Sequence, residues 1–132
     1  MRTSPLHDVA FHTGPLPPAA ATGLIAGAGA VLVFEGVARP TEGGRAIMAL
    51  EYEAYQPMAS RVLGELVATA RARFGLLALS VQHSVGRVPA GACSLRVVVC
   101  AAHRKEALCA VEWLIDALKR DVPIWKKAVF AD

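Results

Sequence analysis

Apolar residues recur along this chain at two spacings, and each spacing predicts a different kind of element. In two segments they return every three or four residues, which is the period of one face of an α-helix. The first segment covers residues 57–74 and ends at Gly75, a residue type that commonly terminates helices. The second covers residues 104–120, with Leu108 and Leu114 in its apolar stripe. We therefore expect two amphipathic helices.

Five shorter segments have the composition of β-strands. The first, residues 30–34, is apolar and rich in β-branched residues, which predicts a buried strand. In the second, Met48, Leu50 and Tyr52 are expected on one face. The five segments are residues 30–34, 46–55, 76–82, 94–101 and 124–130. Their order relative to the helices predicts a single α+β domain with an antiparallel or mixed sheet and two main helices.

The first eighteen residues are rich in proline and show no clear period. We interpret residues 1–18 as an extended or loosely ordered N-terminal arm, and residues 19–132 as the domain. The apolar stretch 19–34 is shorter than the roughly 20 residues that a membrane-spanning helix needs. Arg2 is followed by polar, proline-rich sequence and not by the apolar region of a secretory signal. We expect a soluble, cytoplasmic protein.

Composition and charge narrow the classes of function. The chain has 132 residues, of which 55% are hydrophobic and 19% charged, as in a globular domain. Its net charge of +3 suits an anionic small molecule or an acidic protein surface, and is low for a nucleic-acid-binding module. The three cysteines match neither a disulfide framework nor a zinc site, so we expect buried thiols in a reducing compartment.

The candidate chemistry lies in cations placed at the ends of the expected elements. Arg39 follows the first strand, His103 and Arg104 begin the second helix, Lys119 ends it, and Lys126 follows in the last strand. Each taken alone is more often a solvated surface residue. Together, cations beside strand ends and a helix N-terminus favour an anion site, and a lysine held among them can act as an acid, a base or a nucleophile. No set of residues has metal-ligand spacing.

The length of the second helix bears on how these cations could meet. Arg104 and Lys119 stand at its opposite ends, and fifteen residues at the helical rise separate them by roughly 22 Å. One small ligand cannot readily touch both in the same chain. If both belong to one site, we expect that site to be shared between two subunits of a symmetric dimer.

Several ordered blocks resemble the large, catalytic subunit of molybdopterin synthase, the MoaE family. The resemblance covers about three quarters of the chain, from Gly29 to Lys127. The blocks that carry it are Phe34-Glu35-Gly36-Val37-Ala38-Arg39, Leu50-Glu51-Tyr52-Glu53-Ala54-Tyr55, Ala102-His103-Arg104 and Val122-Pro123-Ile124-Trp125-Lys126-Lys127. It implies a dimeric fold similar to the α/β hammerhead.

The resemblance also implies a reaction. Proteins like this work with a small ubiquitin-like carrier whose C-terminal Gly-Gly ends in a thiocarboxylate. Sulfur passes from that thiocarboxylate to cyclic pyranopterin monophosphate, and two rounds make the dithiolene of molybdopterin, the precursor of the molybdenum cofactor. Two large subunits and two carriers form a heterotetramer. The large subunit is implied to need no metal or cofactor of its own.

Carried over by position, the resemblance assigns roles to particular residues. Lys119 would meet the carrier's C-terminus and assist sulfur transfer, and Lys126 would complete the catalytic set. Arg39 would bind phosphate and pterin together with His103 and Arg104 of the second subunit. Other residues implied to line the pocket are Val37, Ala38, Lys127 and Ala128.

Two positions depart from the family's pattern. Ser84 stands where the family usually has arginine, and Ala128 where it usually has glutamate. One alternative is therefore a non-catalytic dimeric relative that binds the carrier without turnover. A module that binds RNA or DNA is a second alternative, disfavoured by the scattered cations and by an aromatic content of 6%.

Overall fold

The computed structural model describes residues 7–20, 23 and 25–131. Within them, seven strands and two helices alternate in the order that the sequence predicts, with β1 and β3 as additions. The helices are α1 (Met58–Phe74) and α2 (Arg104–Asp121). The strands are β1 (His7–Thr13), β2 (Ala30–Val37), β3 (Thr41–Glu42), β4 (Arg45–Ala54), β5 (Ala78–Pro89), β6 (Cys93–Ala101) and β7 (Ile124–Phe130).

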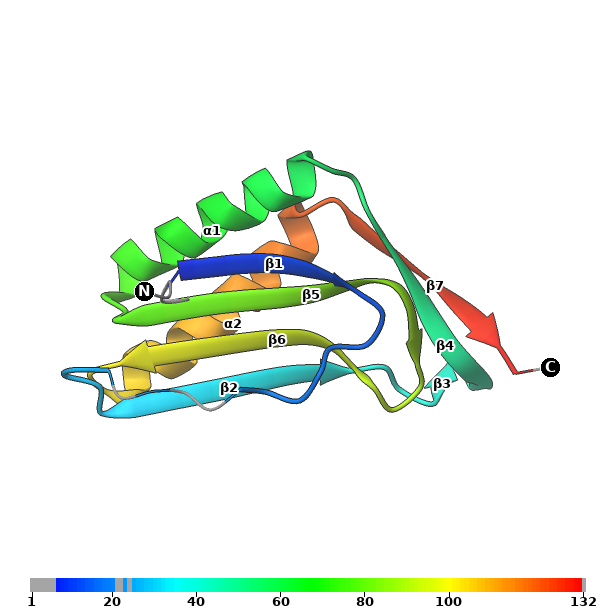
Figure 1. Ribbon diagram of the computed structural model, residues 1–132, viewed down its shortest axis with the longest axis horizontal. Helices are drawn as coiled ribbons and strands as arrows, with labels where there is room; N and C mark the ends of the chain where they lie inside the picture. The colour runs from blue at the N-terminus through cyan, green and yellow to red at the C-terminus, as the bar shows by residue number, and fades with distance from the viewer. Residues whose placement is uncertain (1–6, 21–22, 24, 132) are drawn as a thin grey trace.

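The strands form one mixed sheet, as Figure 1 shows. The main path runs β2-β6-β5-β4-β3, with every neighbour antiparallel. β1 pairs with β5 in parallel, and β7 pairs with β4 antiparallel. The expected α+β domain with a mixed sheet and two main helices is therefore confirmed.

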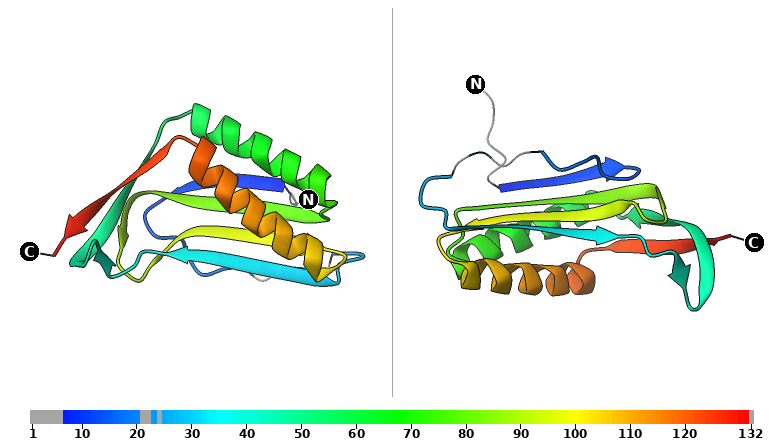
Figure 2. Two further views of the ribbon diagram at one scale, coloured as in Figure 1. Left: turned by 180° about the vertical axis from the view of Figure 1, so that it is seen from behind. Right: turned by 90° about the horizontal axis from the view of Figure 1, so that it is seen from below.

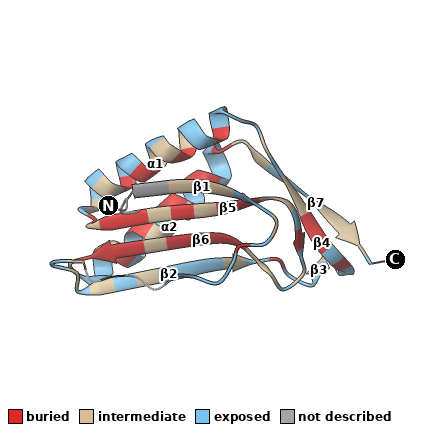
Figure 3. Cartoon of the chain, viewed as in Figure 1, coloured by how far each residue is buried: buried red, intermediate tan, exposed pale blue. Residues whose placement is uncertain are grey.

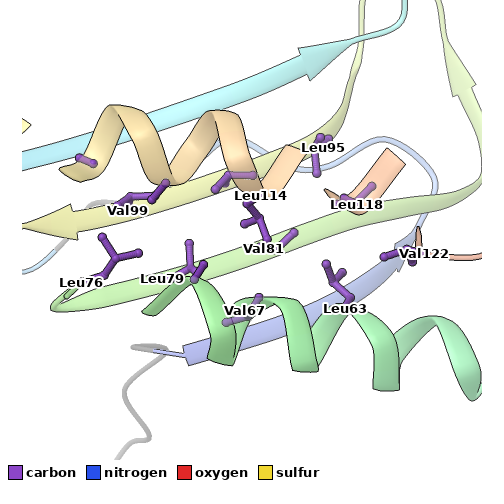
Figure 4. Packing of buried hydrophobic residues seen from close by; sticks show 14 of the residues in the cluster. Leu63, Val67, Leu76, Leu79, Val81, Leu95, Val99, Leu114, Leu118 and Val122 are labelled. Atoms are coloured by element: carbon purple, nitrogen blue, oxygen red, sulfur yellow. The ribbon is translucent and has the colours of Figure 1, made fainter. Parts of the chain in front are cut away.

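Both helices cover the same face of the sheet, and the main core lies between them and β5 and β6 (Figure 2). Leu63 of α1 and Leu114 of α2 are fully buried, and they point toward Leu79, Val81 and neighbouring side chains of the sheet (Figure 4). Burying such a side chain contributes about 1.5–3 kcal/mol to folding. This contact fixes α2, and with it Lys119, relative to the sheet.

Gly86 marks the point at which β5 changes partners. Up to Val85 the strand pairs with β1, and from Gly86 onward it pairs with β4. Gly86 has φ +80°, a conformation that residues with a Cβ rarely adopt. The bend turns β4 and β7 away from the main sheet as a ribbon, which Figure 1 shows to the right of the helices.

Residues 30–34 form the predicted strand, but the prediction that this strand is buried was wrong. β2 lies at the edge of the sheet, and Val31 and Val33 are 48% and 49% exposed. Figure 3 shows this strand mostly in the colour of exposed residues, whereas its neighbour β6 is mostly in the colour of buried residues. An apolar run predicts a strand, but only the neighbouring strands determine how much of it is buried.

The expected alternation in β4 is also interrupted. Met48 was expected on the same face as Leu50, yet Leu50 is buried and Met48 is 53% exposed. The pairing of β4 with β7 shifts between Ile47 and Ala49, so Met48 is the extra residue of a β-bulge. A bulge rotates the strand locally and ends the simple two-residue period.

Other expectations bear on the N-terminal segment and on the cysteines. Residues 7–13 of the expected arm are extended as strand β1, while residues 1–6 lie outside the described residues. The division at residue 18 stays a prediction. The expectation of three buried thiols was wrong for Cys109, which is exposed on α2, whereas Cys100 is buried and Cys93 half-buried. No helix within the described residues is long and apolar enough to cross a membrane.

Candidate active site

A cavity of about 490 Å³ opens where the β4–β7 ribbon meets the C-terminal end of α2. Its wall draws on β2, β3, β4, β5, β6, α2 and β7, so segments far apart in the sequence must come together to form it. The lining residues are Phe34, Gly36, Val37, Arg39, Glu42, Leu50, Tyr52, His83, Ser94, Leu95, Ile115, Leu118, Lys119, Val122, Ile124, Trp125 and Lys126.

Three of the cations expected at a site line this one cavity. Arg39 follows the end of β2, Lys119 lies in the last turn of α2, and Lys126 lies on β7. Among the described residues that line the cavity, Glu42 is the one carboxylate. The charge of the wall is therefore positive, and such a concave surface attracts anions. Val37, also expected at the pocket, lies in the same wall.

Of the two adjacent lysines, Lys126 lines the cavity and Lys127 does not. Lys126 is paired with Tyr52 and Lys127 with Glu51 in the ladder between β7 and β4. Side chains alternate across a strand, so the side chain of Lys127 leaves the opposite face. Ala128 packs against a second small core cluster. Its role and that of Lys127 at the pocket stay predictions.

Ala38 lies next to the cavity but does not line it. Its side chain is buried in the second core cluster, and its backbone N–H donates to the carbonyl oxygen of Ala92 at 3.0 Å. It holds the backbone between Val37 and Arg39, which both line the cavity. A role for Ala38 in the pocket is therefore indirect in this geometry.

His103 and Arg104 lie at the other end of α2 from the cavity. Both are exposed, and Nδ1 of His103 is 3.4 Å from a carboxylate oxygen of Glu106 in the first turn. The helical rise puts Arg104 and Lys119 about 22 Å apart. The structure thus brings Arg39, Lys119 and Lys126 together within one chain, and leaves His103 and Arg104 outside that group.

Sequence reasoning missed a neutral polar group in the same cavity. The hydroxyl of Tyr52 is 3.1 Å from Oγ of Ser94, and the Tyr52 ring meets the His83 ring edge-on at 5.2 Å between centroids. These residues come from three different strands. Their proximity depends on strand pairing, and no local spacing in the sequence signals it.

Among the described residues, no three or more His, Cys, Asp or Glu side chains gather where they could hold a metal ion.

Comparison with known families decides the identity of the fold. The model of the MoaE protein family matches residues 12–121. The chain belongs to the MoaE family. The match contains both helices and strands β2 to β6, and thus most of the elements that build the cavity.

Individual relatives agree with this assignment. The chain is 46% identical over 105 residues to a molybdopterin synthase catalytic subunit of Oryza sativa subsp. indica. These 105 residues make up 80% of this chain. The chain spans about half (54%) of the length of that rice protein.

Solved structures agree on the fold. Molybdopterin synthase from Staphylococcus aureus superposes with a TM-score of 0.77 at 34% identity, covering 83% of this chain and 80% of the other. A complex of subunits 1 and 2 of the molybdopterin-converting factor from Helicobacter pylori superposes with a TM-score of 0.71. At 24% identity, covering 94% of this chain and 90% of the other, this second likeness concerns the fold alone.

Proposed function

We propose that this chain is the catalytic subunit of a molybdopterin synthase. In this reaction a small carrier protein with a C-terminal Gly-Gly thiocarboxylate gives its sulfur to cyclic pyranopterin monophosphate, and two rounds produce the dithiolene of molybdopterin. The observation that carries the proposal is the convergence of Arg39, Lys119 and Lys126 on one cavity. Membership of the MoaE family supports it.

The cations suit this chemistry because both reactants are anions. A thiocarboxylate and a phosphate repel each other in water, and positive side chains fixed in a cavity offset that repulsion. They also stabilise negative charge that develops during transfer. We assign Lys119 to the carrier's C-terminus and Lys126 to the transfer step. Arg39 binds the substrate phosphate.

A homodimer accounts for the remaining expected residues. His103 and Arg104 cannot reach the cavity at the far end of their own helix, about 22 Å from Lys119. In a two-fold dimer the N-terminal end of one α2 can lie beside the C-terminal end of the other, so that each cavity receives both residues from the second subunit. With one carrier bound to each subunit, the assembly is a heterotetramer.

We place the protein in the cytoplasm. Cys93, Cys100 and Cys109 are free thiols, the state that a reducing compartment maintains. Burial raises the pKa of the Cys100 thiol, which keeps it in the unreactive protonated form.

Reconstitution tests the proposal. The purified chain is mixed with a thiocarboxylated carrier and cyclic pyranopterin monophosphate, and molybdopterin is measured as its fluorescent oxidation product. We expect product only when both this chain and the thiocarboxylate are present. A carrier ending in an ordinary carboxylate is the matched control. Carrier binding without product contradicts the proposal and indicates a non-catalytic relative.

A further inference from the structure

The cavity has two chemically different parts. Arg39, Lys119 and Lys126 form a charged part, whereas Tyr52, His83 and Ser94 form a neutral hydrogen-bonding part. His83 and Ser94 are each only 5% exposed and Tyr52 is half-buried, so this second group is more buried than the three exposed cations. Cations attract any anion, and selection among anions therefore needs groups of another kind.

The hydrogen bond of His83 to the backbone fixes which ring nitrogen carries the proton. Nδ1 lies 2.7 Å from the carbonyl oxygen of Ser84. A carbonyl oxygen can only accept, so Nδ1 donates and carries the hydrogen. Burial lowers the pKa of His83, and the bond to Ser84 offsets only part of that effect. At neutral pH the ring is uncharged, and Nε2 is left with a free lone pair.

Nε2 is available to a ligand. Within the described residues Nε2 has no hydrogen-bond partner. It is also absent from the buried polar atoms that lack both a partner and contact with solvent. His83 lines the cavity, and Nδ1 on the other side of the ring is bonded to the backbone, so Nε2 is the ring nitrogen left for a ligand in the cavity. Nε2 is thus a hydrogen-bond acceptor without a donor in the described residues.

We infer that Nε2 of His83 accepts a hydrogen bond from an N–H group of the pterin ring, which makes His83 a specificity-determining residue. This inference rests on the proposed function. A lone pair repels phosphate and thiocarboxylate oxygens, which are themselves acceptors, so the group bound here must be a donor. The pyrimidine edge of a pterin carries N–H donors and no negative charge.

The surroundings of His83 favour a flat heterocycle over the carrier's peptide tail. Phe34, Tyr52 and Trp125 also line the cavity, and aromatic faces stack on heterocyclic rings. A Gly-Gly tail has no ring to stack. Tyr52 is a positioning residue here, because its hydroxyl is bonded to Ser94 and its ring contacts the His83 ring at an interplanar angle of 80°.

Three variants separate recognition from folding. In His83→Asn the amide can keep the donor to Ser84 but has no atom at the Nε2 position. His83→Gln places an amide oxygen near that position. His12→Asn is the matched control, since His12 is exposed on the neighbouring strand β1.

Binding and kinetics provide the first measurement. We expect His83→Asn to weaken binding of cyclic pyranopterin monophosphate, measured by calorimetry without the carrier, by about 10-fold. KM for the pterin should rise similarly while KM for the carrier stays unchanged. His83→Gln should recover part of the loss, and His12→Asn should match wild type. A His83→Asn enzyme that makes product with wild-type KM overturns the inference but leaves the proposed function intact.

A second measurement, by NMR, uses only the wild-type protein and so does not depend on whether a variant folds. In wild-type protein with 15N-labelled histidine, an unprotonated Nε2 that gains a hydrogen bond shifts upfield when the pterin is added. An unmoved His83 Nε2 signal at saturating pterin overturns the inference. A shift caused by a Gly-Gly peptide in place of the pterin also overturns it, and assigns His83 to the carrier. Wild type that binds the pterin with this shift but forms no product contradicts the proposed function alone.

Discussion

Tyr52 and Lys126 lie directly opposite each other in the antiparallel pairing of β4 with β7. Directly opposed residues on one face of a sheet have Cβ atoms about 4.5–5.5 Å apart. The neutral group that contains Tyr52 therefore lies beside the lysine assigned to sulfur transfer. Lys127 is paired with Glu51, and its side chain leaves the other face. Two adjacent lysines thus have separable positions.

This difference predicts unequal effects of removing the two lysines. Lys126→Ala should lower kcat by about 100-fold or more, the scale of a lost catalytic group. Lys127→Ala, which removes the same charge from the opposite face, should have a much smaller effect. Steady-state rates of molybdopterin formation compare the two. Equal losses would show that net charge, and not placement in the cavity, is what matters.

Removal of Lys119 should abolish sulfur transfer without dissociating the dimer. We expect Lys119→Ala to lose at least about 100-fold in rate, while light scattering gives the wild-type mass. Arg120→Ala is the neighbouring control, because Arg120 is outside the cavity wall and pairs with Asp121 at 3.0 Å. Wild-type activity in Lys119→Ala would remove Lys119 from the mechanism.

The shared site predicts complementation between inactive variants. Arg104→Ala and Lys119→Ala should each be nearly inactive alone. After random mixing, half of the dimers carry one of each, and each such dimer holds one intact site, so activity should return to about a quarter of wild type. The measurement is product formation after the two variants are co-refolded or co-expressed. Activity no higher than the sum of the separate variants would place both residues in the same subunit's site.

The elements of the fold that the sequence predicts correctly are those whose signals lie within a few neighbouring residues. The start of α1 and its end at Gly75 were predicted correctly because helical period and terminating glycine act within a few residues. The exposure of β2 and the bulge at Met48 depend on neighbouring strands, which no local pattern reveals. The same is true of the pairing of β1 with β5, which joins segments far apart in the sequence.

The site divides in the same way. Charges at element ends indicated an anion site, and Arg39, Lys119 and Lys126 do line one cavity. The bond between Tyr52 and Ser94 joins residues 42 positions apart, and it follows from sheet topology and from the bend at Gly86. Sequence reasoning found the charged half of the cavity and missed the neutral half.

The core should respond to truncation on one face of α2 only. Leu114 is fully buried between this helix and the sheet, whereas Leu108 on the same helix is 55% exposed, contrary to the predicted stripe. Leu114→Ala should lower the free energy of unfolding by about 2–5 kcal/mol. Leu108→Ala should change it by less than about 0.5 kcal/mol. Urea denaturation measures both, and similar losses would contradict the position of the core.

Stability should depend on pH through His83. Burial lowers its pKa below the ordinary 6.5, so the unfolded chain takes up a proton near that pH while the folded chain does not. This contribution to the free energy of unfolding is therefore full above 6.5 and is lost as the pH falls toward the lower folded value. Urea titrations between about pH 5 and pH 8 should show a flatter profile for His83→Asn than for His12→Asn. Parallel profiles would contradict the burial of a neutral ring.

The connection between Lys119 and Lys126 constrains how the chain can vary. It leaves α2, passes Pro123, and enters β7 with its register fixed by the bond from the Tyr55 N–H to the carbonyl oxygen of Pro123. Because side chains alternate along a strand, one residue inserted after Pro123 would bring Trp125 opposite Tyr52 and turn Lys126 to the other face. Natural variation in this segment should therefore consist of substitutions, and single-residue insertions or deletions should be absent from active relatives.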